Sequence, residues 1–266
     1  MDCTASHSLV THYEGILGSS VSIVTPNKKA NAGPRALYEQ LHRTALKHNV
    51  HFLYETNVGA GLPIINTIND LVAGGDRILR IDGVLSGTLS YLFNSFAEGM
   101  LFSDIVRDAR KRGYTEPDPR DDLNGLDVGR KLLILAREAG YPLEFRNIRV
   151  KPLLPRSVLN ARSLEEFFVK LRSVDASYAR ARKSAARNGS VLRYIASFAD
   201  GKGEVSLQQV GPDHPCYSLS GSEILIALTT ENCRDHPIVI RGPGAGAEVT
   251  ATGVFADIIR ISYHQS

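Results

Sequence analysis

One segment, residues 113–131, constrains this chain more than any other. Within nineteen residues it gathers five carboxylates and three cations, which are Glu116, Asp118, Asp121, Asp122, Asp127, Arg120, Arg130 and Lys131. Pro117 and Pro119 each fix their own φ angle and push the preceding residue toward extended backbone. The sequence therefore predicts a rigid, non-helical arm over residues 115–120. So many charged side chains on a stiff backbone indicate a functional site rather than a linker.

A helix is predicted to follow the arm, with Asp122 or Asn124 as its N-cap and an end near Gly140. Asp127 and Lys131 are then four residues apart on one helix face. One interpretation of this pair is an exposed ion pair, worth only about 0.3–0.5 kcal/mol. The other is a partly desolvated lysine, because five apolar residues follow Lys131 directly. Desolvation lowers the pKa of a lysine and gives it the chemistry of a proton donor, so we favour a functional site.

The string GYTEPDPRDDLNGLDV within this segment resembles the signature of homoserine dehydrogenase, in the form found in bifunctional aspartokinase/homoserine dehydrogenases. The resemblance implies an NADP- or NAD-dependent interconversion of L-homoserine and L-aspartate 4-semialdehyde, a step toward threonine, methionine and isoleucine. It also implies that Lys131 is the acid/base residue. The residues it places around the small-molecule substrate are Tyr114, Glu116, Asp122 and Asp127. Gly129 stands where the family usually has alanine, which costs a helix up to about 1 kcal/mol.

A second lysine comes from the segment Val24–Ala30, which is predicted to be a strand running into a loop. The ordinary interpretation of its Asn-Lys-Lys is a solvated turn. However, ligands bind at the carboxyl ends of strands in a doubly wound sheet. The segment is similar to the VTxNK motif of the family, which implies that Lys28 helps to polarise the aldehyde oxygen. The cofactor residues implied by the resemblance are Thr4, Ser6, Asn27, Lys28 and Gly246.

The start of the chain shows apolar residues at helical spacing over residues 9–17, and then a short strand at 21–24. No G-x-G-x-x-G followed by a helix occurs there, although such a loop seats a pyrophosphate in dinucleotide-binding folds. By the resemblance, the first half of the dinucleotide domain is therefore absent. Two alternatives stay open: a non-catalytic fragment or dimerisation module that cannot bind cofactor by itself, and a piece of a fusion with an N-terminal aspartokinase.

Two glycine-rich turns carry further predictions. Residues 56–63 contain glycines that suit a tight turn. Their similarity to a family loop implies a monovalent cation such as Na⁺, bound by the backbone carbonyls of Glu55, Val58, Ala60 and Leu62. The Ser-Gly-Thr at 86–88 is either a simple N-cap or a set of N–H groups aimed at an anion. The similarity of SGTLSY to the family favours substrate contact through Gly87 and Thr88.

The remaining pattern predicts an α/β fold, in which a truncated doubly wound, Rossmann-like cofactor domain accompanies an α+β substrate and dimerisation domain with a mixed sheet. Strands are expected at 51–55, 76–84, 148–154, 191–196, 204–207, 223–228 and 237–240, the last four in an antiparallel sheet. Helices are expected at 33–48, from 64, at 102–112, from 163, at 178–187 and at 251–261. We assign residues 1–54 and 246–266 to the cofactor domain, 64–189 to the substrate domain, and 55–63 and 190–245 to a homodimer sheet.

Composition excludes several other partners. A net charge of +3 is too weak to indicate nucleic acid, and the basic run 178–187 has no aromatic platform nearby, so we interpret it as a solvated helix face. No apolar run approaches the roughly 20 residues of a membrane span. Three cysteines without metal-binding spacing suit a reducing compartment. We therefore expect a cytoplasmic protein, or a plastid one if the source is plant-like.

Overall fold

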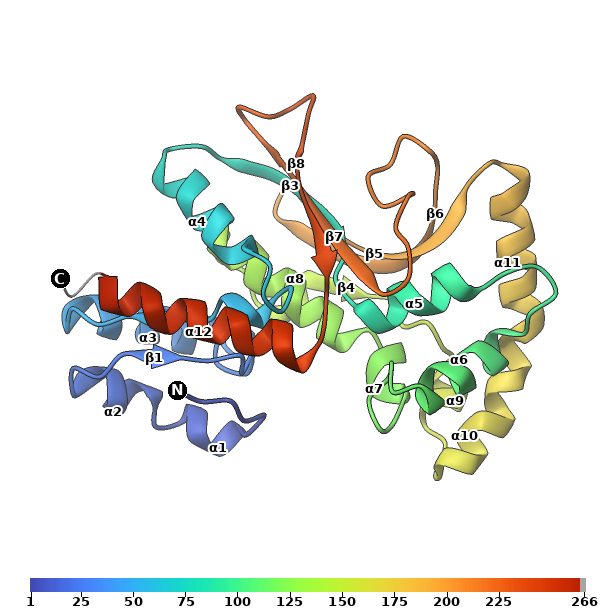
Figure 1. Cartoon of the computed structure of the whole chain (residues 1–266), viewed down its shortest axis with the longest axis horizontal. Helices are drawn as coiled ribbons and strands as arrows, with labels where there is room; N and C mark the ends of the chain where they lie inside the picture. Colours follow the sequence, from blue (N-terminus) through green and yellow to red (C-terminus); the bar gives the residue numbers. More distant parts are fainter. Residues whose placement is uncertain (264–266) are drawn as a thin grey trace.

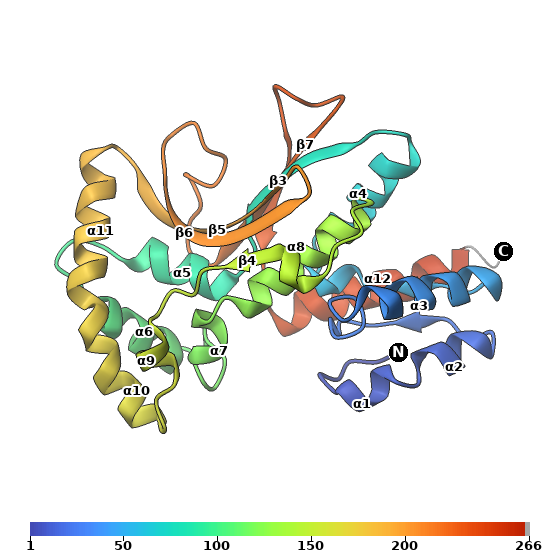
Figure 2. The same cartoon turned by 180° about the vertical axis from the view of Figure 1, so that it is seen from behind.

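The computed structural model of this chain describes residues 1–263, so residues 264–266, which close the range expected for the cofactor domain, lie outside the described residues. At one end, β1 (Ile23–Val24) and β2 (Phe52–Leu53) form a parallel pair. The helices around the pair are α1 (His7–Val10), α2 (Tyr13–Gly18), α3 (Arg35–Lys47) and the C-terminal α12 (Ala247–Tyr263). Figures 1 and 2 show α12 returning beside β1, so both ends of the described chain lie in this N-terminal lobe.

A six-stranded sheet forms the middle of the molecule, with the order β4-β6-β5-β3-β7-β8. Its strands are β3 (Ile78–Val84), β4 (Ile148–Val150), β5 (Val191–Ala199), β6 (Lys202–Val210), β7 (Glu223–Thr230) and β8 (Ile238–Pro243). All neighbours are antiparallel except β4 and β6, so the expected mixed sheet is confirmed.

The boundary expected at 189/190 does not follow this sheet. β3 and β4 precede that boundary, yet β3 pairs with both β5 and β7 and separates them. Residues 55–63 do not join the sheet either, because they form the 3₁₀ turn η1 (Glu55–Asn57) and a loop. Strand patterns alone predicted the strands but gave no signal for which strands become neighbours.

Within residues 1–263, helices cover only one face of the sheet. They are α4 (Ile64–Ala73), α5 (Gly87–Ser95), α8 (Leu126–Glu138) and α11 (Asp175–Arg187). Alternate residues of β7, such as Ile224 and Ile226, join the main core under these helices, whereas Leu225 and Ala227 face the other way. On that second face, the loop at 211–222 contributes Cys216 and Leu219 to a small cluster, and Figures 1 and 2 show no helix over it.

A helical lobe lies at the far end from β1 (Figure 1). It contains α6 (Phe102–Lys111), α7 (Arg120–Leu123), α9 (Arg156–Leu159), α10 (Leu164–Leu171) and the 3₁₀ turn η3 (Arg172–Val174), while η2 (Phe145–Asn147) precedes β4. Phe102 and Tyr178 stack face to face at 3.9 Å between ring centroids and join α6 to α11. None of the helices within residues 1–263 is both long and apolar enough to cross a membrane.

Three local expectations need correction. The pattern over 9–17 predicted one helix, but α1 and α2 are separate. The arm expected over 115–120 ends earlier, because Pro119 already has helical backbone angles and α7 begins at Arg120. The N-cap of α8 is Gly125, at φ +74°, and neither Asp122 nor Asn124. An added Cβ on Gly125 would lie 2.1 Å from the Tyr194 hydroxyl, so glycine is required both for its backbone angle and for space.

Candidate functional site

Two lysines that are far apart in the sequence share one carboxylate. Lys131 Nζ lies 3.0 Å from Asp127 Oδ2, and Lys28 Nζ lies 3.4 Å from Asp127 Oδ1. Lys131 also donates a hydrogen bond to the Leu85 carbonyl at 2.8 Å. Its side chain is only 13% exposed, so the interpretation as an exposed helix ion pair does not describe it. The carboxylate and the carbonyl together hold the Lys131 ammonium in one position.

The electrostatics of this cluster follow from its partial burial. Burial by itself would raise the pKa of Asp127, but attraction to Lys131 and Lys28 outweighs it and holds that pKa well below its usual range. Burial lowers the pKa of Lys28, attraction to Asp127 opposes that shift, and repulsion from Lys131 adds to it. Asp127 therefore stays ionised between its two cations, while Lys28 loses its proton more readily than an exposed lysine does.

A cavity of about 350 Å³ opens beside this cluster and collects most of the predicted substrate residues. They are Gly87, Thr88, Glu116, Asp122, Asp127 and Lys131, together with Lys28 and Gly246. The Glu116 backbone N–H donates to Asp122 Oδ2 at 2.9 Å, so the arm is tied to α7. Burial raises the pKa of Asp122 to about 6. Hydrogen bonds from the Glu116 N–H and the Thr88 side chain oppose this shift, whereas the negative charges of Glu116 and Asp127 add to it.

The Ser-Gly-Thr turn reaches the cavity as the start of α5. Ser86 Oγ accepts from the Leu89 N–H at 3.2 Å, so the N-cap interpretation is confirmed. Thr88 Oγ1 donates to the Tyr114 carbonyl at 2.7 Å and thereby fixes the entrance of the arm. The Tyr114 ring itself stacks on Tyr91 at 4.2 Å and does not line the cavity, so its side chain is not brought to the predicted substrate site.

A second cavity, of about 360 Å³, holds part of the predicted cofactor set. Thr4, Asn27 and Lys28 line it, so Lys28 is common to both cavities. Ser6 does not line it, because its hydroxyl caps α1 and its carbonyl accepts from Asn27 Nδ2 at 2.9 Å. Gly246 lies in the other cavity.

Sequence reasoning missed several residues that line these cavities. In the second cavity they are His7, Lys29 and Arg130, and in the first Ser86, Asn57 and Thr250. The signal for Arg130 was available, because it directly precedes Lys131 within the same charged segment. The others lie in loops, in a 3₁₀ turn or near helix starts, as His7 and Thr250 do, where local spacing does not show which side chains face a cavity.

The glycine-rich loop is held by the side chain of Glu55. Its carboxylate accepts from the backbone N–H groups of Ile64, Ile65 and Asn66 at 2.6, 2.7 and 2.9 Å and so caps α4. Asp257 of α12 accepts from the Glu55 N–H at 3.0 Å. Burial raises the pKa of Glu55 to about 6, although its N–H donors pull it down. Glu55 was singled out for its carbonyl, whereas the structure gives its carboxylate a structural task.

The four carbonyls predicted to bind a cation differ in their hydrogen bonding. The Glu55 and Leu62 carbonyls accept from the Val58 and Ile64 N–H groups. Within residues 1–263, the Val58 and Ala60 carbonyls accept no hydrogen bond. Ala60 has a positive φ of 55°, which a non-glycine residue rarely adopts. Two free carbonyls in a strained loop fit a hard monovalent cation, which prefers oxygen ligands.

Family models cover both parts of the chain. The model "Homoserine dehydrogenase, NAD binding domain" matches residues 1–55, and the model "Homoserine dehydrogenase" matches residues 63–259.

Named relatives agree with these matches. A maize chloroplastic bifunctional aspartokinase/homoserine dehydrogenase is 50% identical over 264 residues, which are 98% of this chain and 29% of the maize protein. The Schizosaccharomyces pombe homoserine dehydrogenase is 41% identical over 98% of this chain and 72% of the S. pombe protein. The chain thus spans less than a third of the plant relatives that it matches.

Solved structures confirm the fold. A Candida auris protein described as of unknown function superposes with a TM-score of 0.93 at 39% identity, covering 98% of this chain and 75% of that one. A hyperthermophilic archaeal homoserine dehydrogenase mutant in complex with NADPH gives a TM-score of 0.76 at 26% identity, covering 99% of this chain and 70% of the archaeal one. From the family model that matches most of its length, and from a 41% identical relative covered over 72%, this chain belongs to the homoserine dehydrogenase family.

Proposed function

We propose that the protein containing this chain interconverts L-homoserine and L-aspartate 4-semialdehyde with NADP or NAD. One observation carries the proposal: Lys28 and Lys131 are held by the shared carboxylate of Asp127, and Lys28 lines both cavities. A cluster of this kind can stabilise negative charge on an oxygen and exchange a proton with it. Aldehyde reduction requires both.

The substrate's charged groups have complementary partners in the first cavity. We assign its ammonium group to the carboxylates of Glu116 and Asp122, which face the cavity from the arm. We assign its carboxylate to Gly87 and Thr88 at the start of α5, where helix N–H groups favour an anion. The aldehyde then points toward Lys131, in keeping with the roles that the resemblance implies.

In the reducing direction, Lys131 donates the proton to the developing alkoxide oxygen, and the positive charge of Lys28 stabilises that oxygen. Asp127 orients both ammonium groups. When bound, the nicotinamide cofactor supplies the hydride. We assign four residues of the second cavity to the cofactor, Thr4, Asn27, Lys29 and Arg130, since the cations Lys29 and Arg130 suit phosphate groups.

Backbone carbonyls of the loop 55–62 are proposed to bind a monovalent cation such as Na⁺. The free carbonyls of Val58 and Ala60 support this proposal. Such a cation would stabilise the loop that lines the first cavity through Ala60 and Gly59. Comparison of thermal unfolding in NaCl and in tetramethylammonium chloride at equal ionic strength tests it, because only the small cation should raise the melting temperature.

A homodimer through the uncovered sheet face is also proposed. Val239 pairs with Ala227 across the ladder, so it shares the face that no helix covers, and it is 47% exposed. Val239→Asp should therefore weaken association. Light scattering behind size-exclusion chromatography measures it, with Leu46→Asp, an equally apolar exposed position in the N-terminal lobe, as the control.

The cytoplasm, or a plastid if the source is plant-like, is the location we propose for the protein. Plant relatives carry chloroplastic names, whereas the bacterial relative from Haemophilus influenzae does not. Fractionation of the source cells, with detection by an antibody against this chain, tests the assignment. Recovery in any other compartment would contradict it.

The first experiment is a fluorescence titration of NADPH into the purified chain, followed by a homoserine oxidation assay at alkaline pH. Saturable binding with turnover is the expected result. A folded chain that neither binds NADPH nor turns over would favour the non-catalytic module instead. The two outcomes separate an enzyme from a chain that holds catalytic residues but depends on further sequence for its cofactor.

A further inference from the structure

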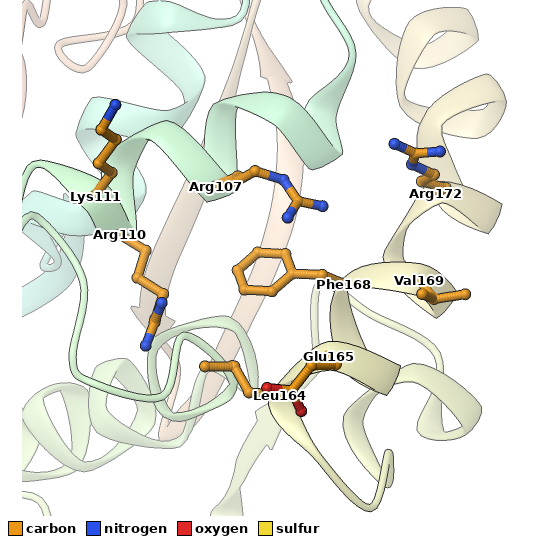
Figure 3. A pocket seen from close by; sticks show the side chains of 8 residues that line it. All are labelled: Arg107, Arg110, Lys111, Leu164, Glu165, Phe168, Val169 and Arg172. Atoms are coloured by element: carbon orange, nitrogen blue, oxygen red, sulfur yellow. The ribbon is translucent and has the colours of Figure 1, made fainter.

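A cavity of about 630 Å³ in the helical lobe belongs to neither of the two cavities described above. It opens between α6 and α10 and is bordered by η3 (Figure 3). Its lining residues are Arg107, Arg110, Lys111, Leu164, Glu165, Phe168, Val169 and Arg172. None of them lines the cavities next to Lys28 and Lys131.

The cations of this cavity outnumber its carboxylates, although the charge of Arg110 helps to lower the pKa of Glu165 and of Asp118. The cavity holds four cations and one carboxylate, and within residues 1–263 Arg107, Arg110, Lys111 and Arg172 form no ion pair. Other cations of the same helices do pair, since Arg112 contacts Asp108 at 2.8 Å and Lys170 contacts Glu166 at 2.6 Å. The unpaired cations are therefore concentrated at the cavity.

Two of the arginines are nevertheless held in position. Arg107 places its guanidinium 4.6 Å from the ring centroid of Phe168, a buried residue of α10, and Figure 3 shows this ring projecting toward α6. Arg110 donates from Nε to the Pro117 carbonyl at 3.1 Å, and neither of its Nη groups donates a hydrogen bond within residues 1–263. Figure 3 shows Lys111 directed away from the Phe168 ring, so the arginines are the better placed cations.

We propose that this cavity binds a small polyanion that carries two or more phosphate or carboxylate groups. Guanidinium groups present forked donors that match both of these groups, and orienting them beforehand reduces the entropy lost on binding. Four cations beside a single carboxylate repel one another, and a multiply charged anion relieves that repulsion. Leu164 and Phe168 supply an apolar floor for the carbon skeleton of the ligand.

The test uses sodium pyrophosphate and the tricarboxylate tricarballylate as probes, in isothermal titration of the whole chain. The cavity variant is Arg107→Gln/Arg172→Gln. The matched control is Arg180→Gln/Arg187→Gln, which removes two exposed arginines from α11. We expect at least one probe to bind the wild type, with a dissociation constant raised tenfold or more in the cavity variant and unchanged in the control. Preference for pyrophosphate or tricarballylate identifies the ligand as a phosphoester or a polycarboxylate.

A footprint on the unmodified sequence keeps the proposal testable if the variant does not fold. Phenylglyoxal modifies arginines, and mass spectrometry reads each site separately. Probe binding should slow modification at Arg107, Arg110 and Arg172 at least threefold. Protection confined to Arg130, in the proposed cofactor cavity, would overturn the proposal. So would equal affinity in both double variants, or no binding at 10 mM probe.

Discussion

The lysine cluster and the arginine cavity treat positive charge in opposite ways. In the lysine cluster, Asp127 neutralises part of the charge of Lys28 and Lys131, and both lysine side chains are mostly buried. In the arginine cavity, none of the four cations forms an ion pair within residues 1–263, and two of them, Arg107 and Arg110, are held by a ring and a carbonyl. A shared anion suits groups that exchange protons, whereas uncompensated guanidinium groups suit the binding of an anion. Positive charge alone therefore does not identify a catalytic site, because the partner of each cation determines whether it can exchange a proton or bind an anion.

Lys131→Ala tests the catalytic role of the lysine cluster and should have the largest effect of the substitutions considered. In a full-length background, the loss of the proposed proton donor should lower kcat about 10³–10⁴-fold, with folding little affected. Steady-state kinetics and circular dichroism measure the two effects. Lys151→Ala is the control, since that lysine is exposed and pairs with Glu204 away from both cavities. Near-normal turnover in the Lys131 variant would contradict the assignment.

Asp127→Asn tests the shared anion itself. Without its charge, the pKa of Lys28 should fall further, because burial already lowers it and Asp127 opposes that shift. We expect kcat for aldehyde reduction to fall about 10²-fold, and the falling limb of its pH–rate profile, where Lys28 loses its charge, to move to lower pH. The profile of kcat against pH is the measurement. An unchanged profile would show that the carboxylate does not control the lysines.

Asp122→Asn should separate stability from activity. The pKa of Asp122 is raised to about 6 in the folded chain, so the folded state binds more protons than the unfolded state between about pH 4 and 6. Wild-type stability therefore decreases as pH rises through that range, and the penalty persists above it. The variant should gain about 1–2 kcal/mol at pH 8 and little at pH 4, after allowance for partial exposure. Urea unfolding at both pH values measures the gain, while homoserine KM should rise.

Single charge substitutions near the arginine cavity should change stability only slightly. Arg172→Gln removes an unpaired cation and should stabilise the chain by up to about 0.5 kcal/mol at low salt. Lys170→Gln breaks a pair with Glu166 and should destabilise it by a similar amount. Both effects should disappear in 1 M NaCl, where charges are screened. Thermal unfolding at two salt concentrations measures both changes. A shift of the melting temperature in the same direction for both variants at low salt would contradict the prediction.

Local elements of this fold were predictable, because amphipathic spacing and proline positions act over a few residues. The helix that carries Lys131 and the strands around 78–84 and 191–199 follow directly from such patterns. The predicted N-cap of α8 was wrong because Asp122 and Asn124 are both good caps by intrinsic preference. The structure places Gly125 at that position instead, where a larger residue would clash with the Tyr194 hydroxyl. That contact joins distant parts of the sequence and leaves no local signal.

The site shows the same division. Asp127 and Lys131 are four residues apart on one helix, so their contact was predictable from helical spacing. The arrival of Lys28 on the other side of Asp127 depends on how the N-terminal lobe packs against α8, and only the family resemblance anticipated it. The carboxylate of Glu55 as a cap for α4 was missed because the two are joined through a loop whose path spacing does not give.

The position of β3 has a consequence for how the chain folds. β3 is made early, yet its two neighbours in the sheet, β5 and β7, come more than a hundred residues later. During synthesis its edges must therefore wait, unpaired, until most of the chain has left the ribosome. Pairings of such long sequence separation are slow to form, and open strand edges promote aggregation. A shortened chain that ends before residue 223 should thus require chaperones, even though every residue of the lysine cluster is present.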